Sequence, residues 1–121
     1  MRPFAFPRQS RIVQEGDFRR IYREGHRMLA FPLRFCVARR REGPSRLGLA
    51  VSRKVGGAVV RNRWKRAVRE VFRQERHRFV ASYDVVVSVD RDAPPVDVAR
   101  VPQAFEALIA WLNLLQEQPR R

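Results

Sequence analysis

Apolar side chains recur with helical spacing over three segments of the chain. They predict a short helix over residues 15–24, a long helix over residues 58–79, and a final helix that starts at residue 98 or 101. The glycine at position 25 marks the end of the first helix. The three apolar stripes are Phe18, Ile21 and Tyr22; then Val60, Trp64, Ala67, Val68 and Val71; and last Phe105, Leu108, Ile109, Leu112 and Leu115.

Two alternating stretches predict β-structure between the first two helices. The first pattern begins at residue 28 and runs to residue 37, and the second covers residues 47–53. One face of the second stretch is apolar, whereas the other consists of Gly48, Ala50 and Ser52 and is almost bare of side chains. Such a face allows close approach to the backbone, either by a packed helix or by a bound chain.

Residues 83–89 form a nearly continuous apolar run, which is typical of a strand that is covered on both faces. The order of helix, strands, helix, strand and helix predicts a single domain, an α/β sandwich with one sheet. We expect residues 11–117 to form this domain, residues 1–10 a flexible N-terminal arm, and residues 118–121 a disordered tail.

The charge of this 121-residue chain is large and unevenly distributed. The formal net charge is +14, and all but two of the 26 cations are arginines. Residues 1–78 contain 22 basic and 6 acidic side chains, whereas residues 79–121 contain 4 basic and 6 acidic ones. This asymmetry predicts a polyanionic partner, most often a nucleic acid, and arginine adds bidentate phosphate contacts.

Composition argues against membrane and disulfide-stabilised classes. No run approaches about 18 consecutive apolar residues, so we expect no membrane span. The first residues lack the apolar segment of a secretory signal. A single cysteine, Cys36, supports neither an internal disulfide nor a cysteine-rich zinc site. We therefore expect a reducing, cytoplasmic setting.

Residue types that commonly perform catalysis are sparse and scattered. His26 and His77 have no serine or cysteine partner nearby in the sequence, so no catalytic triad is indicated. Asp90 and Asp92 could share a divalent metal, although their place in a proline-containing loop favours solvated side chains. The sequence therefore predicts a binding protein without catalytic residues or a metal site of its own.

The long basic helix is the strongest candidate for nucleic-acid binding. Its cations recur on successive turns, which suits contacts with a phosphate backbone. Asn62 either reads a base edge or caps the helix, and both interpretations stay open. Trp64 falls on the apolar stripe, which favours a core position over base stacking.

A cleft beside the first helix is a second candidate. Phe18 and Tyr22 would form its aromatic wall. The strands would supply the other wall, made of Arg34, Cys36, Ala50, Ser52 and Lys54. Aromatic rings beside cations suit single-stranded nucleic acid, whereas ordinary core packing is the alternative.

One segment carries a family resemblance. Residues 48–70 read GLAVSRKVGGAVVRNRWKRAVRE. This segment closely resembles the signature of the bacterial ribonuclease P protein subunit, approximately G-x-x-V-S-K-K-x-G-x-A-V-x-R-N-R-x-K-R-x-x-R-E. Arg53 stands where lysine is usual, and every other fixed position matches. The resemblance extends over roughly residues 11–115.

The resemblance implies an α+β domain of order αβββαβα, with one mixed sheet and a left-handed βαβ crossover, similar to domain 2 of ribosomal protein S5. It also implies a function. Members of the family pair with a catalytic RNA that removes the 5′ leader from precursor tRNA. The RNA performs the hydrolysis and mainly holds the Mg²⁺ ions, the protein lowers the Mg²⁺ requirement, and no other protein partner is obligatory.

The resemblance also assigns residues to two surfaces. Those that match the family's basic helix, and are expected to bind the RNA subunit, are Arg61, Asn62, Arg63, Lys65, Arg66 and Arg69; the helical spacing of the cations adds Arg73. Those that match its leader-binding cleft are Phe18, Tyr22, Arg34, Cys36, Ser52 and Lys54; the strand wall of the cleft adds Ala50. Two rivals remain, which are a structural RNA-binding protein and a protein-only metal nuclease that uses Asp84, Asp90 and Asp92.

Overall fold

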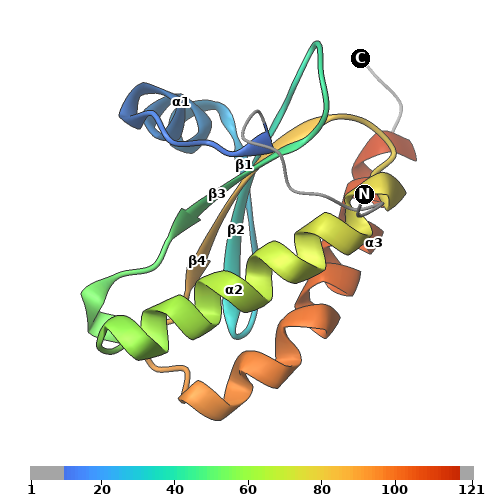
Figure 1. Cartoon of the computed structure of the whole chain (residues 1–121). Helices are drawn as coiled ribbons and strands as arrows, with labels where there is room; N and C mark the ends of the chain where they lie inside the picture. Colours follow the sequence, from blue (N-terminus) through green and yellow to red (C-terminus); the bar gives the residue numbers. More distant parts are fainter. Residues whose placement is uncertain (1–9, 118–121) are drawn as a thin grey trace, which may run out of the picture.

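The computed structural model describes residues 10–117. The elements are α1 (Glu15–Glu24), β1 (His26–Ala30), β2 (Leu33–Arg39), β3 (Arg46–Ala50), η2 (Arg53–Val55), α2 (Ala58–Glu75), η3 (Arg76–Arg78), β4 (Tyr83–Val89), η4 (Pro95–Arg100) and α3 (Val101–Glu117), where η marks a 3-10 helix. Without the 3-10 turns, the order is αβββαβα, as expected. Figure 1 shows α2 running across the strands with α3 beside it, and α1 set apart from both.

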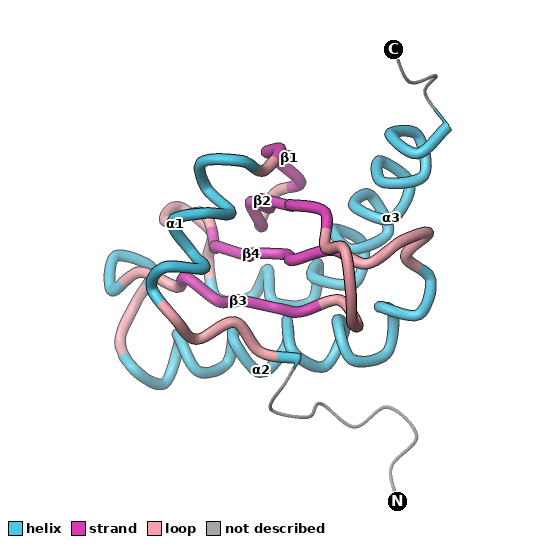
Figure 2. Tube along the Cα trace, turned by 90° about the horizontal axis from the view of Figure 1, so that it is seen from above, coloured by secondary structure: helices cyan, strands magenta, loops and turns pink. Residues whose placement is uncertain are grey.

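The four strands form a mixed sheet in the order β1-β2-β4-β3, which Figure 2 shows from β1 to β3. Strands β3 and β4 are parallel and are connected through α2, whereas β2 runs antiparallel to both β1 and β4. The predicted α+β class is thereby confirmed. The left-handed sense of the crossover and the likeness to ribosomal protein S5 stay predictions.

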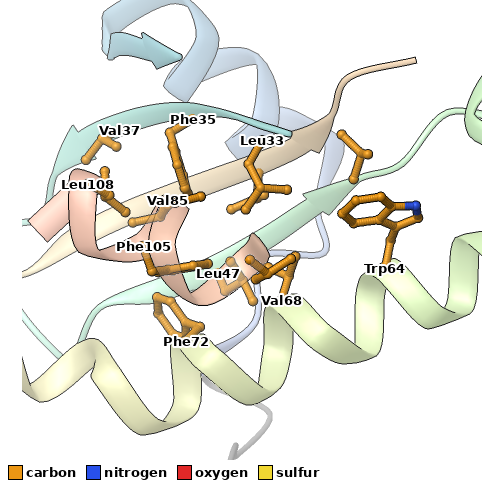
Figure 3. Close-up of a cluster of buried hydrophobic side chains, with 14 of the residues drawn as sticks. Leu33, Phe35, Val37, Leu47, Trp64, Val68, Phe72, Val85, Phe105 and Leu108 are labelled. Carbon is orange, nitrogen blue, oxygen red and sulfur yellow. The ribbon is translucent and has the colours of Figure 1, made fainter. Parts of the chain in front are cut away.

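The main core lies between one face of the sheet and the pair α2 and α3 (Figure 3). Trp64, Val68 and Phe72 of α2 are fully buried there, and the ring of Phe105 on α3 meets Phe35 edge-on, with centroids 5.4 Å apart. The predicted stripes of α2 and α3 therefore face the core. Phe72 was missing from the predicted α2 stripe, because that stripe was centred on a face of the helix that is rotated about its axis from the buried line of Trp64, Val68 and Phe72.

A smaller core lies on the other sheet face, beneath α1. Ile21 of α1 and Ile12 pack there against Cys36, Ala38 and Val86 of the strands. Since Val85 and Val87 point into the main core and Val86 points toward α1, β4 is covered on both faces. This confirms the interpretation of its continuous apolar run.

Several boundaries differ from the sequence prediction. The β pattern that begins at residue 28 contains two strands, β1 and β2, which the Phe31–Pro32 turn separates. The strand expected over residues 47–53 ends at Ala50, and the helix expected over residues 58–79 ends at Glu75. Pro32 separates β1 from β2 because proline has no amide donor for a strand ladder. The 3-10 helices η2 and η3 follow β3 and α2 and provide the backbone hydrogen bonds at these two ends.

The N-terminal boundary also shifts. The hydroxyl of Ser10, a residue expected in the flexible arm, is fully buried and lies 2.6 Å from Nη1 of Arg76, which donates to it. The rest of the predicted arm, residues 1–9, and the predicted tail, residues 118–121, lie outside the described residues. Within the described residues, no helix is long and apolar enough to span a bilayer.

Candidate nucleic-acid interface

A tight glycine turn sets the direction in which α2 leaves the sheet. A Cβ atom at Gly56 would lie 2.9 Å from the side chain of Val60, so a larger residue would push the first turn of the helix away. The guanidinium of Arg61 donates to the carbonyl oxygen of Gly56 at 3.2 Å and closes the turn. Arg61 thus has a structural contact in addition to its predicted RNA-binding role.

The remaining predicted RNA-subunit residues lie along the solvent side of α2. Asn62, Arg63, Arg66 and Arg69 are exposed, and Lys65 is half-buried. Arg73 differs, because its Nε donates to Oε2 of Glu70 at 3.2 Å. Asn62 lies in the second turn, and Gly57 occupies the N-cap position, so the capping interpretation of Asn62 is wrong. Trp64 is a core residue, as its place on the stripe indicated.

Cations of residues 53–69 have no acidic partner within the described residues. The ion pairs involve arginines outside this segment, such as Arg20, Arg34 and Arg78. From residue 43 to residue 69 the sequence itself contains no aspartate or glutamate. The unpaired cations are Arg53, Lys54, Arg61, Arg63, Lys65, Arg66 and Arg69. Surface charge that the fold leaves unneutralised is therefore concentrated on η2 and the first half of α2.

A groove of about 500 Å³ opens on the sheet face that α1 leaves uncovered. Tyr22, Arg34 and Cys36, all predicted leader-binding residues, line it together. The strand register aligns the predicted leader-binding residues of β2 and β3. Arg34 and Ala50 both pair with Ser88 of β4, so the three residues form one row across the sheet. Ala50 therefore lies in the same row as Arg34, beyond Ser88.

Tyr22 presents the exposed aromatic ring of this groove. The guanidinium carbon of Arg27 lies 5.7 Å from the ring centroid, and 37% of the residue is exposed. Burial raises the pKa of the Tyr22 hydroxyl, and Cys36 raises it further against the opposing charge of Arg27. The ring is therefore neutral at physiological pH and offers a flat face beside two arginines, Arg27 and Arg34.

Cys36 contributes shape to the groove. Its thiol donates to the carbonyl oxygen of Ile21 at 3.3 Å, and burial raises its pKa, with Arg27 acting in the opposite direction. A thiol with a raised pKa is a poor nucleophile, so Cys36 gives the groove wall a small apolar surface.

The other predicted leader-binding residues do not line this groove. Phe18 packs against the small face of β3, where a Cβ atom at Gly48 would lie 2.9 Å from its ring. A packed helix therefore covers that face at Gly48. Ser52 and Lys54 lie beyond the end of β3, where the Ser52 hydroxyl accepts from the amide of Lys54 at 3.1 Å and caps η2.

Sequence reasoning missed part of the groove lining. Arg27, Leu29 and Ser88 also line it. A signal for Ser88 was present, because it is the single polar residue of the stretch Val85–Val89 and shares a face with Val86. Arg27 and Leu29 required the knowledge that β1 is a separate strand next to β2.

The acidic residues of the rival nuclease hypothesis do not form a site. Asp84 and Asp90 flank opposite ends of β4, roughly 20 Å apart at the usual rise of a strand. Asp84 is buried, and its carboxylate accepts hydrogen bonds from Arg46 and Arg20. The Asp90 carboxylate accepts a hydrogen bond from Arg34 at 3.1 Å. No group of three or more His, Cys, Asp and Glu residues that could hold a metal ion occurs among the described residues.

Known proteins resemble this chain over most of its length. A family model described as Ribonuclease P matches residues 6–113. The ribonuclease P protein component of Desulfovibrio desulfuricans is 41% identical over 109 residues, which cover 84% of this chain and 81% of the relative. That of Syntrophus aciditrophicus is 36% identical over 119 residues, covering 97% and 100%. The solved RNase P protein of Thermotoga maritima is 29% identical, with a TM-score of 0.72, over 82% of this chain and 94% of the other.

Proposed function

The chain belongs to the ribonuclease P family, and from this premise we propose that it binds both the catalytic RNA and the 5′ leader of precursor tRNA. Its role is in ribonuclease P, an endoribonuclease holoenzyme of tRNA processing, in partnership with the RNase P RNA. The cations of residues 53–69, which have no acidic partner in the described chain, carry the proposal. Such cations gain most from a polyanion, because no internal ion pair must be broken first.

The cationic side of α2 docks on the catalytic RNA. Arg63, Lys65, Arg66 and Arg69 provide phosphate contacts, and these give affinity without sequence preference. Phosphate neutralisation also reduces the repulsion that Mg²⁺ ions would otherwise have to screen. In this assignment the RNA mainly holds the Mg²⁺ ions, performs the hydrolysis and needs less Mg²⁺ when the protein is bound.

The groove beside α1 holds the single-stranded leader. Tyr22 supplies a stacking surface, and Arg27 and Arg34 supply positive charge next to it. Mature tRNA lacks the leader and gains nothing from this groove. Contacts made only with the precursor therefore favour the substrate over the product.

Cleavage at low Mg²⁺ tests the proposal. The purified protein is mixed with a bacterial ribonuclease P RNA at moderate salt, and cleavage of 5′-labelled precursor tRNA is followed, with RNA alone and protein alone as controls. We expect a single cut at the mature 5′ end only when both components are present. Tight RNA binding without rescue would instead indicate a structural RNA-binding protein, and cutting by protein alone would indicate a protein-only nuclease.

A further inference from the structure

A hollow of about 600 Å³ lies between the first turns of α2 and the 3-10 helix η4. Residues at i, i+3, i+4, i+7, i+8 and i+11 of α2 form one wall, so a single stripe of the helix faces it. These residues are Val59, Asn62, Arg63, Arg66, Ala67 and Glu70. Val98 of η4 faces them from the other side.

The stripe combines apolar surface with unpaired polar groups. Val59 is 78% exposed, although it is a large apolar side chain at the mouth of the hollow. Arg63 and Arg66 form no ion pair among the described residues. Glu70, at the far end, is already engaged by Arg73 and Gln74 and so does not neutralise them.

We propose that this hollow receives one unpaired nucleobase of the ribonuclease P RNA. The inference rests on the proposed docking of α2 on that RNA and adds a specific pocket to it. Val59, Ala67 and Val98 provide the apolar surface for the flat faces of the base.

The surrounding polar groups match the rest of a nucleotide. The Asn62 amide has both a donor and an acceptor, which is the combination that pairs with the edge of a base. Arg63 and Arg66 lie on either side and reach the phosphates that flank the base. An apolar peptide would bury the apolar surface but leave both guanidinium groups without a counter-charge.

A filled pocket tests this inference in the full chain. Ala67→Leu enlarges a half-buried side chain of the hollow, and Ala110→Leu makes the same change at an exposed position of α3. Affinity for the RNA subunit is measured over a range of salt concentrations. We expect Ala67→Leu to weaken binding about tenfold, as for one lost base stack, without changing the salt dependence. Ala110→Leu should bind like the parent.

The salt dependence separates the pocket from the docking surface. Arg66→Ala removes a phosphate contact and should lower the slope of log affinity against log salt by about one. If Arg66→Ala has no effect on the slope, the proposed docking of α2 is wrong. If Arg66→Ala behaves as expected but Ala67→Leu binds like Ala110→Leu, the surface stands and the nucleobase pocket is wrong.

A titration of the unsubstituted protein gives an answer that does not depend on how Ala67→Leu folds. The Asn62 side-chain amide and the Ala67 methyl are followed by NMR while AMP or ribose 5-phosphate is added. We expect AMP to shift both signals and ribose 5-phosphate to shift neither appreciably. Equal shifts with the two compounds would show a site for phosphate alone, and no shift with AMP would also overturn the proposal.

Discussion

The Arg20 guanidinium of α1 lies 2.6 Å from Oδ2 of Asp84, at the start of β4, and that carboxylate is almost completely buried. Arg46 of β3 donates to both oxygens of the same carboxylate, at 2.8 and 2.9 Å. Arg46 also reaches Asp17 of α1 at 3.7 Å. Because Ile21 is the only fully buried side chain of α1, this cluster is a main connection between that helix and the sheet. It thereby places Tyr22 beside the groove.

Replacement of Asp84 by asparagine should destabilise the protein. The change leaves Arg20 and Arg46 without their carboxylate, and we expect a loss of about 2–3 kcal/mol in the free energy of unfolding. Breaking a fully buried ion pair costs ~3–5 kcal/mol, and the loss here is smaller because both arginines are partly exposed to solvent. Urea titrations measure it. Glu106→Gln breaks an exposed ion pair with Arg78 and should cost much less. Equal losses in the two variants would contradict the structural role of Asp84.

The same carboxylate should make stability depend on pH. Burial alone would raise the pKa of Asp84, but the hydrogen bonds from Arg46 and Arg20 outweigh it and lower the pKa. Since the unfolded pKa is about 3.9, the stabilisation is complete above that pH and is lost as the pH falls through the lower folded value. We expect the free energy of unfolding to decrease less steeply below pH 4 in Asp84→Asn than in the parent. Identical slopes would contradict this assignment.

Tyr22 and Phe18 should respond differently to truncation. Tyr22→Ala removes the exposed ring of the groove and should weaken precursor tRNA binding by the holoenzyme by about 1–3 kcal/mol, while mature tRNA binding stays the same. Tyr22→Phe keeps the ring and should retain most of the affinity. Phe18→Ala should chiefly lower stability, because the Phe18 ring packs on Gly48. Equal weakening of precursor and mature tRNA by Tyr22→Ala would contradict the groove assignment.

The small face of β3 predicts a further stability effect. A methyl group at Gly48 would lie 2.9 Å from the Phe18 ring and 3.2 Å from Cβ of Ile12, so both must move. We expect Gly48→Ala to lower the free energy of unfolding by about 1–3 kcal/mol, as measured in urea. Gly16→Ala is the matched control, because its new Cβ would lie within 4 Å of nothing beyond its chain neighbours and the backbone of its own helix. A Gly48→Ala protein as stable as Gly16→Ala would show that α1 does not pack there as described.

Periodicity was sufficient for most of the fold. The helices α1, α2 and α3 and the strand β4 have long or continuous apolar patterns, and all four were predicted. The separation of β1 from β2 was not, because Phe31 and Pro32 interrupt a β pattern that has no other turn residue. The periodicity of apolar residues indicates which segments form helices or strands, but it contains little information about where one short strand ends and the next begins.

One part of the candidate site could likewise be predicted from local sequence spacing, and the other part could not. The cations of α2 share one helix, so their common surface follows from spacing alone. The groove depends on contacts between distant residues. Asp84 is 64 residues from Arg20 and 38 from Arg46, and only the strand register brings Arg34, Ala50 and Ser88 into one row. The place of Phe18 on the sheet face at Gly48, away from the groove, likewise depends on how α1 packs.

Arg69 and Arg73, the last two predicted RNA-binding residues of α2, should differ in their contribution to RNA affinity. Arg69 is exposed and has no ion pair among the described residues, whereas Arg73 is half-buried and bonded to Glu70. A phosphate must compete with Glu70 for Arg73 but meets no such competition at Arg69. We therefore expect Arg69→Ala to lower the salt slope of RNA-subunit binding by about one, and Arg73→Ala to change it by much less. Binding isotherms over a fourfold range of salt measure both slopes. If Arg73→Ala lowers the slope as much as Arg69→Ala, the ion pair between Arg73 and Glu70 breaks on RNA binding, and the RNA-binding surface of α2 extends to Arg73.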